Sequence, residues 1–320
     1  MIGITDIEQQ AGLIAEHVVR TPTLPSPGLS ALLGAPVTVK LELLQHTGSF
    51  KARGATAKLL SLSEAERAAG VVAVSGGNHG IALAHMAAAL DVKATVVMPR
   101  SAPARSVEIV EAAGASLRLT DDMDGAFSLA KRLRDEGLTL VHPFDDPLVI
   151  AGQGTVGLEF AEDADGELTD VLVSVGGGGL IAGVAAALRS RRPGVRVWGV
   201  ETEGAEAMSR ALAAGGPVPV ALSSVVSTLS APSVSQLTYD HAAALVTEVL
   251  VVSDREAVQG CLDLADHAKV WGEPAAGCLL PAARRVLERV GDDCRLGLVV
   301  CGGNATTDDV MAWAGRFGLR

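Results

Sequence analysis

The chain has 320 residues, of which 48% are hydrophobic and 3% aromatic, and its formal net charge is −11. This length and apolar content indicate one large α/β domain or two smaller ones with well-filled cores. The acidic charge and the lack of a basic patch argue against nucleic-acid binding. No uninterrupted apolar run reaches the roughly 18 residues that a membrane span needs. Small molecules are therefore the expected ligands.

The N-terminus and the cysteines indicate a cytoplasmic protein. Thr5 and Glu8 have the spacing of a capping box that opens an amphipathic helix, unlike the basic and apolar regions of a signal peptide. The four cysteines form no CxxC pair and have no histidine at a zinc-site spacing. We therefore expect reduced thiols and no metal framework.

Hydrophobic periodicity predicts alternating strands and helices along most of the chain. A half-buried strand at 37–43 precedes a helix that starts near Lys51, and a capping box at 63–66 opens a short helix that ends at Gly70. Further strands are expected at 71–74, 94–98, 116–119, 138–141, 171–175, 195–200 and 296–300. Helices are expected at 79–90, 104–113, 125–134 and 180–188 and after a capping box at 253–256. This order predicts parallel sheets with helical crossovers.

Two segments depart from the alternation. Residues 143–157 carry glycine, proline and acidic residues and interrupt the pattern between two α/β units. Residues 215–235 are rich in Ser, Pro, Val and Ala without a clear period, so they are predicted to form an irregular loop.

Lys51 lies at a strand-to-helix corner. A lysine at a helix start lies at the positive end of the helix dipole, which disfavours its charged form and helps to keep the amine nucleophilic. Such a lysine could form a Schiff base. A solvated lysine on an amphipathic helix fits this stretch equally well, so other stretches must decide.

A run of four glycines follows the strand predicted at 171–175 and precedes a helix. Backbone N–H groups at a helix start, exposed by the lack of side chains, bind phosphate. The run therefore predicts a phosphate site at Gly176, Gly177, Gly178 and Gly179. The stretch also fits a dinucleotide fingerprint that ends at Ala182, with Glu201 at the end of the next strand, so NAD binding is an alternative.

A second glycine-containing turn follows the strand predicted at 71–74. Its N–H groups could hold a carboxylate, while the amide of Asn78 could bond a ring oxygen. A plain helix cap by Ser75 or Asn78 is the alternative. His79 has no acid or second histidine nearby in sequence and fits a helix-start residue better than a metal ligand. Cys301, after the last strand, could be a core residue, a nucleophile or a weak partner to a ligand atom.

Together, Lys51, Asn78, the four glycines and Cys301 resemble the pyridoxal-phosphate enzymes of the tryptophan-synthase β-subunit type, in particular the serine and threonine dehydratases and their relative serine racemase. Five ordered motifs carry the resemblance over nearly the whole chain, at 47–55, 75–80, 142–155, 176–180 and 273–277. It implies an α/β fold of type II, with two lobes of parallel-type sheets flanked by helices. The large domain would comprise 1–65 and 146–320, and the small inserted domain 66–145.

The resemblance also implies roles for single residues. Lys51 would bind the cofactor, pyridoxal 5'-phosphate, as a Schiff base, with Phe50 packed against its ring. Asn78 would bond the ring hydroxyl oxygen, the four glycines would hold the phosphate, and Cys301 would face the pyridine nitrogen as a neutral partner. The substrate carboxylate would lie on the turn formed by Ser75, Gly76, Gly77, Asn78 and His79.

The implied activity is β-elimination from a 3-hydroxy amino acid, such as L-threonine or L-serine, to a 2-oxo acid and ammonia, by a homodimer. A racemase or β-replacement enzyme and a non-catalytic cofactor binder are alternatives. Gly76 stands where the racemase has a serine that reprotonates the opposite face, and residues 228–233 replace the family's Ala-Asp-Gly turn. Glu201 matches one carboxylate of the racemase cation site, but Ala207 stands where an aspartate is expected. No metal is therefore predicted, with Glu201 as the one candidate ligand.

Overall fold

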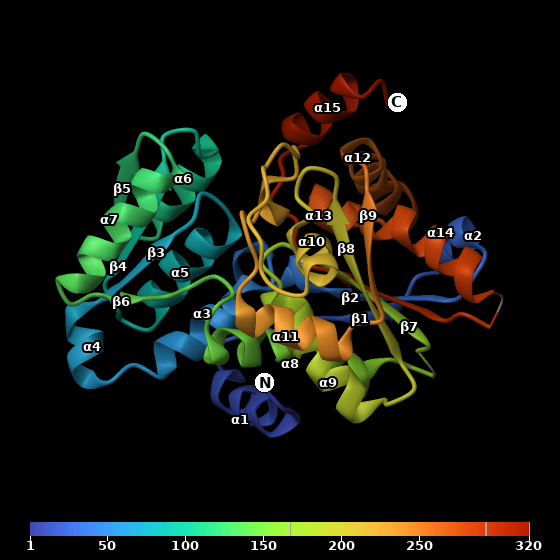
Figure 1. The fold of residues 1–320 in the computed structure, drawn as a ribbon, viewed down its shortest axis with the longest axis horizontal. Helices are drawn as coiled ribbons and strands as arrows, with labels where there is room; N and C mark the ends of the chain where they lie inside the picture. The colour runs from blue at the N-terminus through green and yellow to red at the C-terminus, as the bar shows by residue number, and fades with distance from the viewer. Residues whose placement is uncertain (167, 292, 320) are drawn as a thin grey trace.

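The structure is a computed structural model that describes residues 1–166, 168–291 and 293–319. Within these ranges the strands form two sheets, of order β1-β2-β10-β7-β8-β9 and β5-β4-β3-β6 (Figure 1). All pairings between these named strands are parallel except the antiparallel pair β1 and β2. The strands are β1 (Thr23–Pro25), β2 (Val37–Leu41), β3 (Val71–Val74), β4 (Ala94–Pro99), β5 (Ser116–Thr120), β6 (Thr139–Leu140), β7 (Asp170–Ser174), β8 (Arg196–Thr202), β9 (Glu248–Val252) and β10 (Leu296–Val300).

Helices connect these strands and flank both sheets. In the first half of the chain they are α1 (Ile4–Ile14), α2 (Pro27–Leu33), α3 (Lys51–Leu60), α4 (Glu64–Ala69), α5 (Asn78–Ala89), α6 (Ala104–Ala112), α7 (Met123–Asp135) and α8 (Pro147–Asp163). In the second half they are α9 (Gly179–Arg191), α10 (Ala207–Ala214), α11 (Gln236–Leu245), α12 (Asp254–Asp263), α13 (Pro274–Gly277), α14 (Leu279–Val290) and α15 (Thr307–Arg316). Of the helices in the described ranges, none is long and apolar enough to cross a membrane.

The central strands are buried along their whole length. Every residue of β3, β7 and β10 is buried, because helices cover both faces of a parallel sheet. This explains why the central residues of these strands form continuous apolar runs in the sequence rather than alternating patterns. Their carboxyl ends lead directly into the turns at 75–78 and 176–179 and into Cys301.

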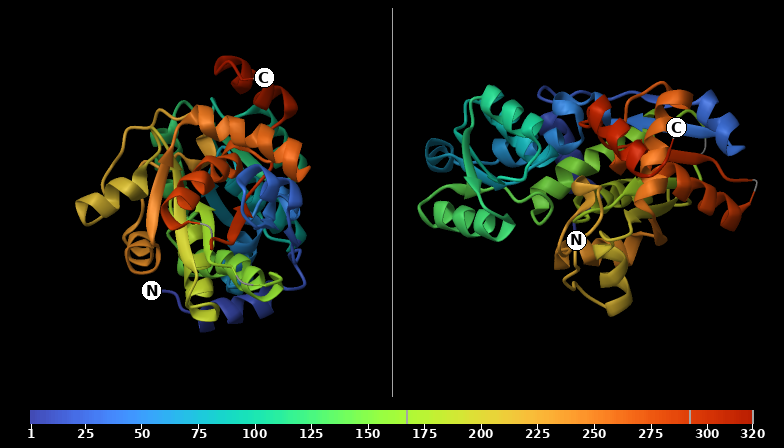
Figure 2. Two further views of the ribbon diagram at one scale, coloured as in Figure 1. Left: turned by 90° about the vertical axis from the view of Figure 1, so that its right-hand side faces the viewer. Right: turned by 90° about the horizontal axis from the view of Figure 1, so that it is seen from above.

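The two sheets lie in separate lobes, side by side (Figures 1 and 2). All strands of the four-stranded sheet fall between residues 71 and 140. Helix α3 precedes this insertion and α8 follows it, and these two helices pack against each other. The domain boundaries 1–65, 66–145 and 146–320 stay a prediction that agrees with this arrangement.

The interruption predicted at 143–157 is wrong, because most of it belongs to the long helix α8. The Asp146 side chain caps this helix by accepting the N–H groups of Leu148 and Val149. Its glycines lower helix propensity and read as a loop in the sequence. In the fold they permit close helix packing, since a Cβ at Gly152 would lie 2.8 Å from the Cα of Gly54 on α3.

The N-terminal capping box is also wrong, whereas those that open α4 and α12 are confirmed. Helix α1 begins at Ile4, and the carboxylate of Asp6 accepts the backbone N–H of Gly3 at 2.8 Å. Thr5 and Glu8 therefore lie within the helix. Residues 215–235 contain only a short 3₁₀ turn, η3 (Ser227–Leu229), as the irregular-loop prediction expects.

Candidate active site

Lys51 is the first residue of α3, as predicted. Its Nζ donates a hydrogen bond to the Pro143 carbonyl at 2.9 Å and lies 5.1 Å from the centre of the Phe50 ring. Burial lowers the pKa of Lys51 to about 8, against a smaller opposing effect of Cys301. The helix dipole, which is the cause expected from the sequence, acts in the same direction as burial, and burial is the largest cause in the structure. The amine is therefore easier to deprotonate than a solvated lysine, as a nucleophile requires.

The four glycines join the end of β7 to the start of α9. Gly178 has φ +90°, a conformation that side chains with a Cβ rarely adopt. Among the described residues, no protein acceptor takes the backbone N–H groups of Gly176, Gly177 or Gly178. Unpaired N–H groups at the N-terminus of a 13-residue helix form an anion site. The geometry thus suits the phosphate predicted here.

Phe144 packs against this glycine turn. A Cβ added at Gly177 would lie 2.1 Å from Phe144 Cδ1, and one at Gly179 would lie 3.0 Å from Phe144 Cβ. The ring of His142 contacts Phe144 edge-on, with centroids 4.7 Å apart. The sequence placed these residues in a family motif without giving them a role. The contact with Phe144 shows why a glycine is needed at position 177.

The turn between β3 and α5 offers a second set of free backbone donors. Ser75 Oγ accepts the N–H of Gly77 at 3.2 Å. Within the described part of the chain, the N–H groups of Gly76 and Asn78 have no protein acceptor. A Cβ at Gly77 would meet only Thr228 Cγ2, at 3.8 Å, so there is space beside the turn. These donors at a helix start fit a carboxylate.

Asn78 connects the two lobes through a buried polar network that the sequence did not reveal. Its Nδ2 donates to both carboxylate oxygens of Glu273, at 2.9 and 3.1 Å, and its Oδ1 accepts from Asn304 Nδ2 at 2.8 Å. Asn304 Nδ2 also donates to the Thr47 carbonyl. Burial raises the pKa of Glu273. The only sequence signal for Glu273 was its place at the start of the 273–277 motif.

The imidazole of His79 does not face the turn that it was predicted to help form. It is buried, and its Nε2 donates to the Val141 carbonyl at 2.9 Å. Burial lowers the pKa of His79 to about 3, with Lys51 as a further cause. The ring is therefore neutral, and its backbone N–H is the group left to contact a substrate carboxylate.

Cys301 is a buried thiol at the end of β10. Burial raises the pKa of Cys301 well above its ordinary value. Its Sγ lies 3.9 Å from Ser174 Oγ, and its carbonyl accepts the N–H of Phe50 at 3.1 Å. The backbone thus brings Cys301 next to the lysine segment. A neutral thiol argues against the nucleophile interpretation, because the thiolate is the reactive form.

Glu201, at the end of β8, holds the start of α10. Its carboxylate accepts the N–H groups of Met208 and Ser209, at 2.7 and 2.9 Å, and the Ser209 hydroxyl at 2.6 Å. In the described ranges, no group of three or more His, Cys, Asp or Glu side chains could hold a metal ion. The NAD alternative would require this carboxylate to accept a ribose hydroxyl. Its hydrogen bonds to α10 already occupy it, so Glu201 does not fit that role.

Glu201→Gln should make the free energy of unfolding less dependent on pH. Burial raises the pKa of Glu201 to about 7 from an ordinary 4.5, so the folded protein holds a proton that the unfolded chain releases. The contribution of this proton to the free energy of unfolding is complete below pH 4.5 and is lost as the pH rises through 7. Denaturant unfolding from pH 4.5 to 8 should show the free-energy advantage of wild type over the variant shrinking. An advantage that is constant with pH would contradict this prediction.

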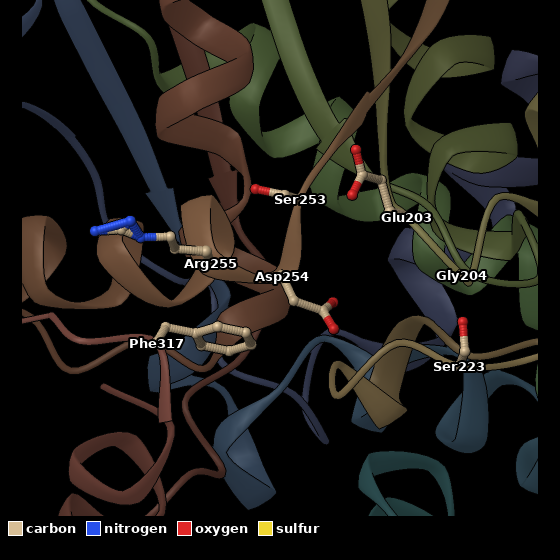
Figure 3. A pocket seen from close by; sticks show the side chains of 7 residues that line it. All are labelled: Glu203, Gly204, Ser223, Ser253, Asp254, Arg255 and Phe317. Carbon is tan, nitrogen blue, oxygen red and sulfur yellow. The ribbon is translucent and has the colours of Figure 1, made fainter. Parts of the chain in front are cut away.

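A surface pocket lies beside the carboxyl ends of β8 and β9. It is lined by Glu203, Gly204, Ser223, Ser253, Asp254, Arg255 and Phe317 (Figure 3). The carboxylate of Asp254 accepts from Ser224 Oγ at 2.5 Å and from the Val225 N–H at 2.9 Å. It therefore anchors the irregular loop. None of the residues predicted for cofactor or substrate lines this pocket.

The residues around Lys51 fit pyridoxal phosphate. The cofactor needs an amine to bind its aldehyde, donors for its phosphate and a partner for its pyridine nitrogen. Lys51 offers an amine with a lowered pKa, the glycine turn offers unpaired N–H groups, and Cys301 offers a neutral thiol. No Asp or Glu takes the place of Cys301, so the nitrogen partner carries no charge.

Comparison with known proteins agrees with this fit. The model of a family described as pyridoxal-phosphate-dependent enzymes matches residues 14–302. The chain is 37% identical to phenylserine dehydratase from Ralstonia pickettii, covering 99% of this chain and 97% of the relative. It is 38% identical to L-threonine ammonia-lyase from Thermotoga maritima, covering 95% and 76%. The crystal structure of serine racemase from Dictyostelium discoideum superposes with a TM-score of 0.89 at 31% identity, covering 95% and 99%. The chain therefore belongs to the family of pyridoxal-phosphate-dependent enzymes.

Proposed function

We propose that this enzyme eliminates the β-hydroxyl of a 3-hydroxy amino acid, such as L-threonine or L-serine, as water. Hydrolysis of the resulting enamine takes up one water and gives a 2-oxo acid and ammonia. The observation that carries the proposal is the position of Lys51 at the start of α3, next to Phe50, whose N–H donates to the Cys301 carbonyl at 3.1 Å. Burial lowers the pKa of Lys51 to about 8 and keeps the Cys301 thiol neutral by raising its pKa. The similarity to a phenylserine dehydratase and an L-threonine ammonia-lyase supports the same reaction class.

Each residue of the site has a separate role in the proposed reaction. When bound, the cofactor supplies an electron sink for the carbanion at Cα. The N–H groups of the turn at 75–79 hold the substrate carboxylate, and the amine of Lys51 takes the Cα proton. The β-hydroxyl leaves as water, and the proton that Lys51 took from Cα balances this step. Water then hydrolyses the released enamine to the 2-oxo acid and ammonia. Phe50 would pack against the cofactor ring, and Gly176 to Gly179 would hold its phosphate.

Cys301 favours elimination over competing reactions of the same carbanion. Burial raises the pKa of Cys301 well above its ordinary value, so its neutral thiol would accompany the pyridine nitrogen of a bound cofactor without protonating it. A weaker electron sink shortens the life of the carbanion and favours loss of the β-hydroxyl over transamination. Asn78 would bond the ring oxygen in exchange for its contact with Glu273, because Glu273 and Asn304 occupy both its amide nitrogen and its amide oxygen in this structure.

The substrate side chain, the assembly and the cellular location are part of the proposal. The space beside Gly77 and Thr228 also suits a 3-hydroxy amino acid larger than threonine. We expect a cytoplasmic homodimer. Turnover of L-serine, L-threonine and L-threo-phenylserine, measured as 2-oxo acid and ammonia in equal amounts, tests the function. A protein that binds the cofactor but releases neither product from any of the three would contradict it.

Amino-acid racemisation is the second candidate, because the fold superposes on a serine racemase. Racemisation needs an acid on the face of the carbanion opposite Lys51, and Gly76 has no side chain to donate a proton.

Gly76→Ser should raise the share of racemisation. A Cβ at position 76 would lie 3.1 Å from Ala102 Cβ, so the neighbour must move only slightly. Chiral chromatography of recovered L-serine, alongside ammonia release, measures the share. Gly76→Ala is the matched control, because it adds the same Cβ without a hydroxyl. Equal D-serine formation by wild type and Gly76→Ser would show that the glycine does not limit racemisation.

A further inference from the structure

Four charged side chains are buried together behind the lysine-bearing helix. They are Lys40 on β2, Glu42 just after β2, Arg53 on α3 and Glu159 on α8. Lys40, Glu42 and Arg53 are 0% exposed and Glu159 is 8% exposed. The cluster holds two positive and two negative charges, so it is neutral as a whole. None of these residues belongs to the proposed reaction.

Arg53 is the centre of this cluster. Its guanidinium binds Glu42 through two hydrogen bonds, Nε to Oε2 and Nη2 to Oε1, both 2.8 Å. It binds Glu159 through two more, Nη1 to Oε1 at 2.6 Å and Nη2 to Oε2 at 2.8 Å. Nη1 also donates to Thr155 Oγ1 and Nη2 to the Val19 carbonyl. The planar fork thus fixes Arg53 in two directions at once.

Lys40 completes the cluster from the opposite side. Its Nζ donates to Glu159 Oε2 at 2.6 Å and to the Thr21 carbonyl at 2.8 Å. Because each carboxylate has a cation and each cation has at least one carboxylate, no buried charge is left uncompensated. Removing any single member would leave one.

Stability alone does not explain this arrangement. Burying ions costs solvation, and apolar residues of similar volume often stabilise a core as well or better. A cation in the first turn of a helix is also disfavoured by the helix dipole. Arg53 occupies such a position, two residues after Lys51. The cluster therefore indicates that these side chains serve to hold α3 in a fixed position rather than to add stability.

The place of the cluster suggests what it fixes. It joins α3, which precedes the inserted lobe, to α8, which follows it, and ties both to β2 of the large sheet. The first turn of α3 carries Lys51. Because α3 continues through α4 into the four-stranded sheet, the cluster would keep the first turn of α3 with the large sheet if the inserted lobe moved.

We propose that Arg53 is a positioning residue for Lys51. Its double ion pair holds the first turn of α3 against Glu42 and Glu159, and this fixes the direction of the Lys51 amine. The inference rests on the proposed role of Lys51 and is independent of which amino acid is the substrate.

Arg53→Lys tests the proposal, because it keeps the charge and removes the fork. The variant should fold, with a thermal unfolding transition as sharp as that of wild type. Capture of added pyridoxal phosphate, trapped by borohydride and followed by absorbance and mass, should slow about tenfold, and kcat should fall about tenfold with KM changed less than about threefold. The pH midpoint of capture should also shift, since the amine occupies a different position.

Arg192→Lys is the matched control. The guanidinium of Arg192 also donates several hydrogen bonds, to the carbonyls of Ala161 and Ala164. Arg192 lies at the end of α9, away from the first turn of α3. The Arg192→Lys variant should capture pyridoxal phosphate at a rate within about twofold of wild type, and its kcat should also lie within about twofold. A folded Arg53→Lys with wild-type capture rate, pH midpoint and kcat would overturn the proposal, as would equal losses in Arg192→Lys.

Glu159→Gln keeps the proposal testable if Arg53→Lys does not fold. This variant loosens one side of the fork while Glu42 still holds the other, so capture should slow in the same direction but by less. Wild-type capture in a folded Glu159→Gln would overturn the proposal. Failure of the proposed function would look different: wild type itself would then show no borohydride-trapped cofactor at Lys51.

Discussion

Lys51→Ala should lower turnover by roughly 10³-fold or more and abolish covalent capture of pyridoxal phosphate, because one amine serves as both anchor and base. The fold should remain intact. The side chain makes a single hydrogen bond, to the Pro143 carbonyl, whose loss costs about 1 kcal/mol. Borohydride reduction followed by peptide mass mapping locates the attachment, and coupled assays of 2-oxo acid measure turnover.

Lys131→Ala serves as the control for this variant. Lys131 is an exposed lysine on α7, in the inserted lobe and outside the proposed site. It should keep wild-type turnover and capture. If Lys51→Ala still produces 2-oxo acid at an appreciable rate without an added amine, the assignment of Lys51 is wrong.

Gly177→Ala should weaken cofactor binding without unfolding the protein. The added Cβ would lie 2.1 to 2.4 Å from ring carbons of Phe144, so the ring or the turn must move. Loss of one or two hydrogen bonds to a phosphate costs about 1.5–3 kcal/mol, or roughly 10- to 150-fold in Kd. Titration of the apoprotein with pyridoxal phosphate, followed by absorbance, measures the loss.

Gly194→Ala is the matched control. A Cβ at Gly194 meets no heavy atom within 4 Å, and the residue lies just beyond the helix that the glycine turn opens. Its Kd for the cofactor should equal that of wild type. Equal affinity in Gly177→Ala would mean that the phosphate lies elsewhere, and the role of the four glycines would have to be abandoned.

Most of the fold could be predicted because its central strands are short, apolar and separated by turns. The predicted strand at 296–300 has the same bounds as β10, and that at 71–74 the same as β3. Lys51 was placed at a helix start, and the four glycines between a strand and a helix. These features depend on local chain chemistry, which a single sequence records.

What the sequence could not show depends on contacts between distant residues. Helix α8 was missed because its glycines are explained only by the helices packed against them. The role of Glu273 depends on Asn78, which lies 195 residues away. The ion pair between Arg53 and Glu159 spans 106 residues. Periodicity cannot detect such pairs, because their partners share no local pattern.

The most direct test of the account is the product ratio of the wild-type enzyme with pyridoxal phosphate and L-serine. Pyruvate and ammonia should form at equal rates, and chiral chromatography should recover little D-serine. This result follows if Lys51 is the base, Cys301 leaves the pyridine nitrogen unprotonated and Gly76 supplies no second acid. D-serine forming faster than pyruvate would contradict it and would show that another residue donates a proton to the opposite face.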